Sequence, residues 1–206
     1  MAENAADHQD PELEGAEDVE GGASPAEEPE LDPQVAARRA AALSRIRKFG
    51  DPVLRTRARE VQHIDDELRD EVRRMAELMG DALGVGLAAP QVGILHRLLV
   101  YQVAPQTEPA ALVNPEIEWA GSDSEAMEEG CLSLPEVLVD VERPIHVRVR
   151  ARNQDGEPIL VEASGLEARV IQHEIDHLDG VLIVDRASRE QRKEAMRVLR
   201  EAQQAA

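Results

Sequence analysis

Apolar side chains recur at helical spacing between Asp65 and Leu83. They lie three or four residues apart, as one face of an amphipathic helix requires, at Leu68, Val72, Met75, Leu78 and Met79. Asp65 or Asp66 stands at the N-cap position, where a carboxylate accepts hydrogen bonds from the free N–H groups of the first turn. The pattern predicts a helix from about Asp66 to Leu83.

Further along the chain, stretches rich in β-branched residues predict strands. They run from about Leu95 to Tyr101, Leu112 to Trp119 and Leu138 to Arg150. Asn153-Gln154-Asp155-Gly156 predicts a tight turn into a further strand at Pro158 to Glu162. Together with the helices, these strands indicate an α+β fold.

Both ends of the folded part are predicted to be helical, at about Gln34 to Arg47 and about Ser188 to Gln203. In the second segment basic residues outnumber acidic ones: Arg189, Arg192, Lys193, Arg197 and Arg200 against Glu190, Glu194 and Glu201. Side chains four residues apart are neighbours on a helix and can form ion pairs. We therefore interpret this segment as a solvent-exposed helix.

The first 33 residues carry most of the net charge. The 206-residue chain has a formal charge of −19, of which residues 1–33 contribute −12 because they contain twelve carboxylates and no Lys or Arg. With few large apolar side chains, this segment cannot bury enough surface to offset the entropy of ordering. We predict a disordered extension over residues 1–44 and one domain over residues 45–206.

Composition also bounds location and partners. The chain has one cysteine and can form no internal disulfide, which fits a reducing interior. No apolar stretch is as long as a membrane span, and the acidic start is unlike an Arg-rich transit peptide. Negative charge and only three aromatic residues argue against binding nucleic acid by phosphate contacts or base stacking. We expect a cytoplasmic protein with no membrane association and no sequence-specific nucleic-acid binding.

The segment His173-Glu174-Ile175-Asp176-His177 has the spacing of a metal site. Residues at i and i+4 share one helix face, so two imidazoles can bind one ion. Glu174 is offset by one position and can reach a water on the metal without becoming a ligand. Apolar flanks predict that this helix, about Leu166 to Leu178, is buried and that Gly180 ends it.

A catalytic metal site normally has three protein ligands, so a third is needed. The position six residues after His177, where one protease class has a histidine, is Ile183. A second class would use a glutamate one helix downstream, and the candidates there are Glu190, Glu194 and Glu201. The single cysteine, Cys131, is the better candidate. It would complete a mixed sulfur and nitrogen site suited to iron(II), zinc, nickel or cobalt.

Three segments of the chain resemble the peptide deformylases in order and spacing. They are Gly84-Val85-Gly86-Leu87-Ala88-Ala89-Pro90-Gln91-Val92-Gly93, Glu129-Gly130-Cys131-Leu132-Ser133 and His173-Glu174-Ile175-Asp176-His177-Leu178-Asp179-Gly180. The resemblance covers about Ile46 to Ala187. It implies antiparallel sheets packed around a central metal-binding helix, followed by a C-terminal helix.

The resemblance also implies roles for single residues. Cys131, His173 and His177 would bind one divalent metal ion, and Glu174 would act as general acid and base. The Gln91 side-chain amide and the Leu132 backbone N–H would hold the formyl oxygen, which agrees with the need for preorganised donors at an oxyanion.

Substrate contacts are implied at four further positions. Gly86 and Val85 would bind the substrate peptide, and Glu129 would set the geometry around the cysteine turn. Arg169 stands where family members usually place an apolar residue lining the pocket for the first substrate side chain. We expect its methylene stem to cover that pocket and its guanidinium to point outward.

The implied activity is removal of the formyl group from the N-terminal methionine of newly synthesised polypeptides, with release of formate. A thiolate ligand favours Fe2+, with Zn2+, Ni2+ and Co2+ as alternatives. Family members with a similar last helix dock on the ribosome, so the segment from Ser188 is a candidate ribosome contact. Two other functions stay open: a zinc endopeptidase that uses a downstream glutamate, and a catalytically inactive binding module.

Overall fold

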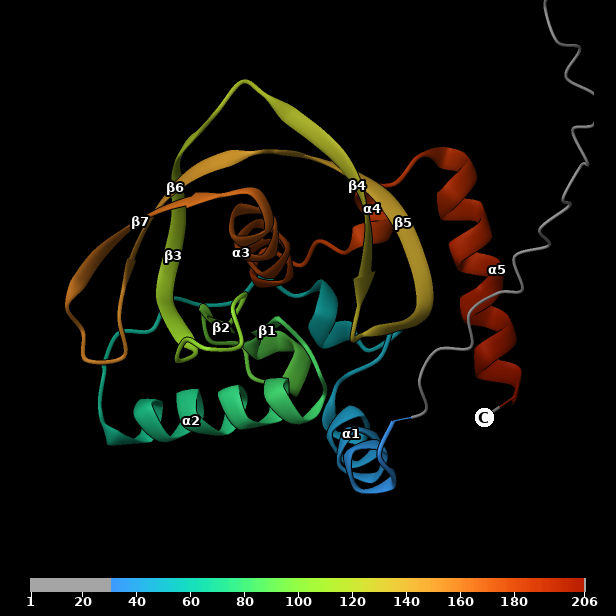
Figure 1. Cartoon of the computed structure of the whole chain (residues 1–206), viewed down its shortest axis with the longest axis horizontal. Helices are drawn as coiled ribbons and strands as arrows, with labels where there is room; N and C mark the ends of the chain where they lie inside the picture. Colours follow the sequence, from blue (N-terminus) through green and yellow to red (C-terminus); the bar gives the residue numbers. More distant parts are fainter. Residues whose placement is uncertain (1–30, 206) are drawn as a thin grey trace, which may run out of the picture. The chain divides into compact units, whose positions relative to one another are not determined.

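The computed structural model describes residues 31–205, with side chains up to residue 202. A compact unit of helices and antiparallel strands begins at Asp32 (Figure 1). Within residues 31–205 no helix is long and apolar enough to cross a membrane. Of the extension predicted to be disordered, residues 1–30 lie outside the described residues, whereas residues 33–44 belong to a helix.

Five strands form an antiparallel sheet in the order β1-β2-β3-β6-β7. They are β1 (Gly86–Ala88), β2 (Leu98–Tyr101), β3 (Ala110–Ala120), β6 (His146–Arg152) and β7 (Pro158–Ser164). The predicted turn between β6 and β7 is confirmed. Asn153 Oδ1 accepts hydrogen bonds of 3.0 Å from the N–H groups of Asp155 and Glu157, and Gly156 adopts a φ of 87°, a region that glycine occupies without strain.

A second sheet contains only β4 (Ser124–Cys131) and β5 (Leu134–Pro144). Cys131 pairs with Leu134, so Leu132-Ser133 forms the tip of the hairpin. Every second residue of β5 is buried: Val137, Val139, Val141 and Arg143. The face that these residues share therefore points into the protein.

Helix α2 (Asp66–Asp81) confirms the first predicted helix. Asp65 is its N-cap, and the Asp65 carboxylate accepts a hydrogen bond of 3.1 Å from the Leu68 N–H. All five residues of the predicted apolar face are buried in a core shared with β1 and β2. Helix α1 (Pro33–Arg45) adds Ala42 to this core. The domain therefore begins upstream of the predicted start at residue 45.

Helix α3 (Gly165–Leu178) is the centre of the fold, as the resemblance implied (Figure 1). Its apolar residues pack against the five-stranded sheet, where Val147 and Val149 of β6 lie in the same core. After the short α4 (Ile183–Arg186), helix α5 (Arg189–Ala205) covers β5 through Ala195 and Leu199. Two 3-10 turns, η1 (Pro52–Arg55) and η2 (Ala89–Val92), complete the described elements.

The prediction of one strand from Leu138 to Arg150 is wrong. β5 ends at Pro144 and β6 begins at His146, in the other sheet. Proline has no N–H for a ladder, and the Ile145 N–H instead donates to Asp123 O at 2.9 Å, so the chain changes sheets here. Strand β4 was not predicted because its Glu-rich sequence has weak intrinsic strand preference; pairing with β5 makes it a strand.

Candidate metal centre

Helix α3 presents both histidines of the motif toward the hairpin of the second sheet. The helix ends where expected: Asp179 is the C-cap, Gly180 has a φ of 75°, and the Val181 N–H donates to Asp176 O at 2.8 Å. The rings of His173 and His177 meet edge to face with centroids 5.1 Å apart. The i and i+4 spacing therefore places the two imidazoles together, as predicted.

Cys131 lies at the end of β4, opposite the histidine pair. Its Sγ is 3.2 Å from His177 Nε2, and the donor atoms of Cys131, His173 and His177 all lie within 4.8 Å of one another. Burial acts to raise the pKa of the Cys131 thiol, but the two histidines outweigh it, and the pKa lies well below its usual value. The thiolate is thus favoured, which is the form that binds metal.

Glu174 is buried against the backbone of β1. A Cβ added to Gly86 would lie 2.4 Å from Glu174 Oε1, so only glycine leaves room for this carboxylate. Burial raises the pKa of Glu174 above its ordinary value, and the positive charges of His173 and His177 oppose that rise. A carboxylate with a raised pKa is a stronger base than an ordinary one, which suits a group that takes up a proton.

Gln91 is held with its amide NH2 toward the same centre. Its Oε1 accepts a hydrogen bond of 2.8 Å from the Ala88 N–H, and this contact fixes which end of the amide faces the site. Its Nε2 is 3.7 Å from Cys131 Sγ and donates to Ser133 Oγ at 3.3 Å. Nearby, Lys48 Nζ donates to Leu132 O at 2.9 Å, which ties the hairpin tip to the segment before η1.

Glu129 supports His173 from behind. Glu129 Oε2 lies 3.0 Å from His173 Nδ1, and the Glu129 carboxylate also accepts from Arg143 Nε at 2.7 Å and Nη2 at 3.0 Å. Burial acts to raise the pKa of Glu129, but the bonds from His173 and Arg143 lower it to about 2. A carboxylate that orients a histidine through Nδ1 is the usual support of a metal-binding imidazole.

The prediction that the Arg169 guanidinium points outward is wrong. Arg169 is buried, and its Nη1 donates to Glu129 Oε1 at 2.7 Å and to Val141 O at 2.9 Å, while Nη2 donates to Glu125 O at 2.7 Å. A charged side chain extends to the surface when it has no partner in the protein interior. Here the Glu129 carboxylate and two strand carbonyls accept hydrogen bonds from the buried guanidinium. Arg169 therefore joins α3 to the second sheet.

Arg143 and Asp176 were missed as parts of the site. Arg143 bridges two buried carboxylates, since its Nη1 also donates to Asp176 Oδ2 at 2.9 Å, and Arg186 pairs with the same aspartate. A signal for Arg143 was present in the sequence. It continues the alternation of Val137, Val139 and Val141, which places it on the buried face of β5.

The downstream glutamates do not reach the histidines. Glu190, Glu194 and Glu201 are exposed on α5, where Glu194 and Glu201 both pair with Arg197. In residues 31–205, the group of donors close enough to hold a metal is Cys131, His173 and His177. This geometry removes the support for the endopeptidase alternative. The pairs with Arg197 agree with the ion pairs predicted for a solvent-exposed helix.

These residues fit a divalent metal ion. One thiolate and two imidazoles are a donor set for borderline metals. Among the described residues, Glu174 Oε2 and His177 Nδ1 are buried without a hydrogen-bond partner. Buried polar atoms nearly always have partners, so Glu174 Oε2 marks a place for a group from beyond the described residues. His177 Nδ1 lies on the other side of its ring from Nε2, the nitrogen that faces Cys131 Sγ, and does not mark the metal position.

Comparisons with known proteins agree with this geometry. A sequence model of the family described as Polypeptide deformylase matches residues 43–193. A peptide deformylase of Thermotoga maritima is 50% identical over 146 residues, covering 71% of this chain and 88% of the relative. One of Acidothermus cellulolyticus is 48% identical over 162 residues, covering 79% and 88%.

Solved structures give the same result. The crystal structure of the Thermotoga maritima peptide deformylase superposes with a TM-score of 0.68 at 51% identity, covering 70% of this chain and 97% of that one. A peptide deformylase from Synechococcus elongatus in complex with actinonin has a TM-score of 0.71 at 48% identity, with 73% and 84% covered. By sequence and by fold, the chain belongs to the polypeptide deformylase family.

Proposed function

We propose that Cys131, His173 and His177 hold one divalent metal ion at which this chain removes the formyl group from formylated peptides. The family is metal-dependent and removes the N-terminal formyl group from nascent polypeptides, and the chain is a hydrolase of this family. The observation that carries the proposal is the approach of the three donor atoms to within 4.8 Å of one another, beside the buried Glu174 carboxylate.

A bound divalent metal would supply Lewis-acid polarisation and would acidify the attacking water. Glu174 takes the proton of that water and then passes it to the departing amine nitrogen, so that formate and a free N-terminus result. Its carboxylate is buried against Gly86. Burial raises the pKa of Glu174, which favours the uptake of this proton.

Gln91 and the Leu132 backbone N–H hold the formyl oxygen. Charge develops on that oxygen as the carbonyl carbon becomes tetrahedral, and preorganised donors stabilise it without reorganisation. The Gln91 amide is preorganised, because the Ala88 N–H binds its oxygen and leaves its NH2 directed to the side of Cys131. Leu132 follows Cys131 directly at the hairpin tip, and Lys48 donates a hydrogen bond to the Leu132 carbonyl oxygen.

Substrate contacts divide into two kinds. Gly86 is the first residue of β1, and the exposed Val85 precedes it; both bind the peptide that follows the formylated residue. Glu129 and Arg169 are buried and hydrogen-bonded to each other. We therefore assign them to positioning His173 and to forming the wall behind the substrate pocket.

The test is formate release from a formyl-methionyl peptide by anaerobically purified protein, with metal analysis of the same sample. Glu174→Gln keeps the side-chain shape, and we expect it to retain the metal and to lose about 10²- to 10⁴-fold in turnover. Cys131→Ser should lose metal as well as activity. The matched control is Glu190→Gln on the exposed face of α5. Retained metal in Cys131→Ser, or loss of metal in Glu190→Gln, would contradict the assignment.

We also propose Fe2+ as the native ion, because a thiolate in the donor set favours a soft or borderline metal. Iron(II) beside a thiolate is sensitive to oxygen. Activity should therefore fade in air and persist when nickel or cobalt replaces iron. Zinc as the main ion in anaerobically purified, active protein would overturn this part of the proposal.

A contact between α5 and the ribosome, and a cytoplasmic location, stay predictions. Deleting α5 would uncover Ala195 and Leu199, which are buried against β5. A sharper test reverses charges that are exposed on this helix, in Arg189→Glu with Lys193→Glu. Unchanged co-sedimentation with ribosomes would rule out a contact through these charges.

A further inference from the structure

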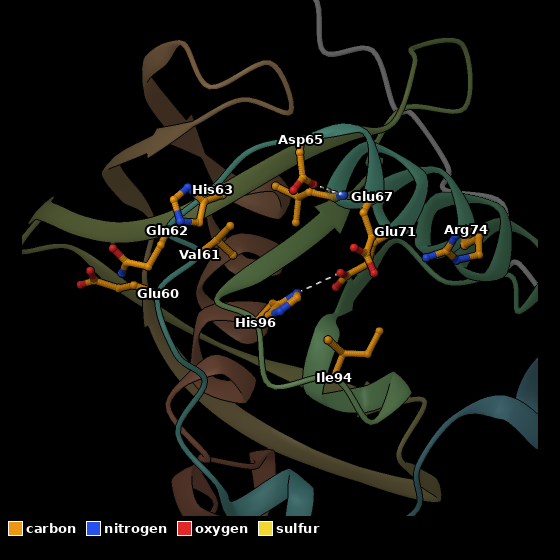
Figure 2. A pocket seen from close by; sticks show the side chains of 11 residues that line it. Glu60, Val61, Gln62, His63, Asp65, Glu67, Glu71, Arg74, Ile94 and His96 are labelled. Carbon is orange, nitrogen blue, oxygen red and sulfur yellow. Dashed lines mark hydrogen bonds and ion pairs between the residues drawn. The ribbon is translucent and has the colours of Figure 1, made fainter.

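A pocket away from the metal centre lies between the start of α2, the extended segment before it and the segment before β2. It has a volume of about 500 Å³. Figure 2 shows the side chains around it. The polar ones that matter below are Glu60, Asp65, Glu67, Glu71, Arg74 and His96. None of these belongs to the metal centre, so the pocket is a separate feature of the fold.

Glu71 is the unusual residue in this pocket. Its side chain is only 7% exposed, and Oε2 lies 2.9 Å from His96 Nδ1. Among the described residues, Oε1 is buried and has no hydrogen-bond partner. A buried acceptor without a donor costs free energy, most of all on a carboxylate. The half-satisfied Glu71 therefore calls for a donor from outside the chain.

The charge around Glu71 selects a cation. Four carboxylates line the pocket, from Glu60, Asp65, Glu67 and Glu71, against the single guanidinium of Arg74. Asp65 is already engaged as the N-cap of α2. Glu67 and Glu71 stand four residues apart on one helix face, where like charges repel. A positive ligand would relieve this repulsion and supply the missing donor.

The size and walls of the pocket favour an organic cation over a bare metal ion. In the described part of the chain, three donors come within metal-binding distance of one another at Cys131, His173 and His177, and this pocket has no such group. Val61, Leu68 and Ile94 line the pocket as well and provide an apolar wall. An alkyl chain that ends in an ammonium group would match both the wall and the carboxylates.

We propose that this pocket binds an aliphatic primary ammonium group, with Glu71 as its principal acceptor. The group could belong to a free diamine or to a lysine side chain, because the recognised chemistry is the same in both. The ammonium donates to the Glu71 carboxylate and faces Glu67, while its methylene groups pack on Ile94 and Val61. The proposal is independent of the reaction at the metal centre.

The test is calorimetric titration of the metal-loaded protein with 1,4-diaminobutane at low ionic strength. We expect saturable binding that Glu71→Gln weakens at least tenfold and that Glu67→Gln weakens less. The matched control is Glu77→Gln, which removes one charge from an exposed position of the same helix outside the pocket. It should leave the affinity unchanged. Formate release without diamine should be the same in Glu71→Gln as in wild type, which also shows that the variant is folded.

Three results would overturn the proposal. The first is the absence of saturable binding, and the second is equal weakening by Glu71→Gln and Glu77→Gln, which would mean a general charge effect. Uptake of Zn2+ that depends on His96 and that diaminobutane does not displace would also overturn it, in favour of a metal site. Nα-acetyl-lysine amide separates the two sources. Binding equal to that of diaminobutane points to a lysine side chain, and binding of the diamine alone points to a free polyamine.

Discussion

Two glutamate–histidine pairs in this protein have nearly the same geometry and different surroundings. Glu129 lies 3.0 Å from His173 Nδ1, and Glu71 lies 2.9 Å from His96 Nδ1. Both carboxylates are buried, with side-chain exposures of 5% and 7%. Glu129 also accepts bonds from Arg143 and Arg169, whereas one oxygen of Glu71 has no partner among the described residues.

The difference shows that the consequence of burying a carboxylate depends on its hydrogen-bond partners. Around Glu129 the chain supplies every donor, and the result is a rigid support for a metal-binding histidine. Around Glu71 the described residues supply one donor and leave a pocket. His173 is 12% exposed and His96 is 49% exposed, so the first pair is closed and the second opens to ligands.

The strongest way to break the closed pair is Arg143→Leu. This change leaves Glu129 and Asp176 buried without their shared cation, and removing one partner of a buried ion pair typically costs about 3–5 kcal/mol. We expect a loss of that size in the free energy of unfolding, measured by urea denaturation. Arg148→Leu is the control, because the Arg148–Glu162 pair is exposed and should contribute about 0–1 kcal/mol. Equal losses in the two variants would contradict the distinction.

Acid should act on the closed pair through Glu129. The pKa of Glu129 is lowered from 4.5 to about 2 in the folded protein. A lowered folded pKa means that this stabilisation is fully present above about pH 4.5 and is lost as the pH falls toward 2. The effect is about 3 kcal/mol at most, since one pKa unit corresponds to about 1.4 kcal/mol. The difference in unfolding free energy between wild type and Glu129→Gln should shrink over this range. A difference independent of pH from 5 to 2 would show that the Glu129 charge is not responsible.

Glu129→Gln should also weaken metal binding. Loss of the carboxylate behind a ligating histidine typically lowers metal affinity about 10- to 100-fold. Competition with a chromogenic chelator measures this directly. Glu71→Gln is the matched control, because it changes the same type of pair away from the metal centre, and its metal affinity should equal that of wild type. A similar loss in both variants would mean that global stability, and not the position of His173, sets the affinity.

The smallest effect is expected for His96→Gln. Half of the His96 side chain is exposed, so the lost hydrogen bond to Glu71 should cost about 1 kcal/mol or less. Thermal unfolding of the metal-loaded protein measures this. A cost near that of Arg143→Leu would show that the second pair is as tightly integrated as the first.

Much of the fold could be predicted from local patterns. The α2 helix, with its buried face and Asp65 cap, the turn at Asn153 and the end of α3 at Gly180 all follow from side chains within one or two turns of each other. Strands that depend on a distant partner could not be predicted in this way. β4 is a strand because β5 pairs with it, and the change of sheet after Pro144 depends on a bond between Ile145 and Asp123.

The residues of the site divide in the same way, into those placed by local spacing and those placed by partners distant in sequence. The spacing of His173, Glu174 and His177 on one helix could be read directly, because helical geometry fixes which residues share a face. The orientation of Arg169 could not, because Glu129 and the strand carbonyls that bind it are distant in sequence. Arg143 was overlooked although its place in the β5 alternation signalled burial.

The two-histidine motif, the candidate cysteine and the resemblance to the deformylases can be read from the sequence alone. These depend on residue identity and short spacing. Which buried charges are satisfied depends on the folded chain: Arg143 holds Glu129 and Asp176 together, and Glu71 keeps one oxygen without a partner among the described residues. Whether a buried charge finds a partner depends on elements far apart in the chain, and the free energy of burial is set by that partner and not by the residue alone.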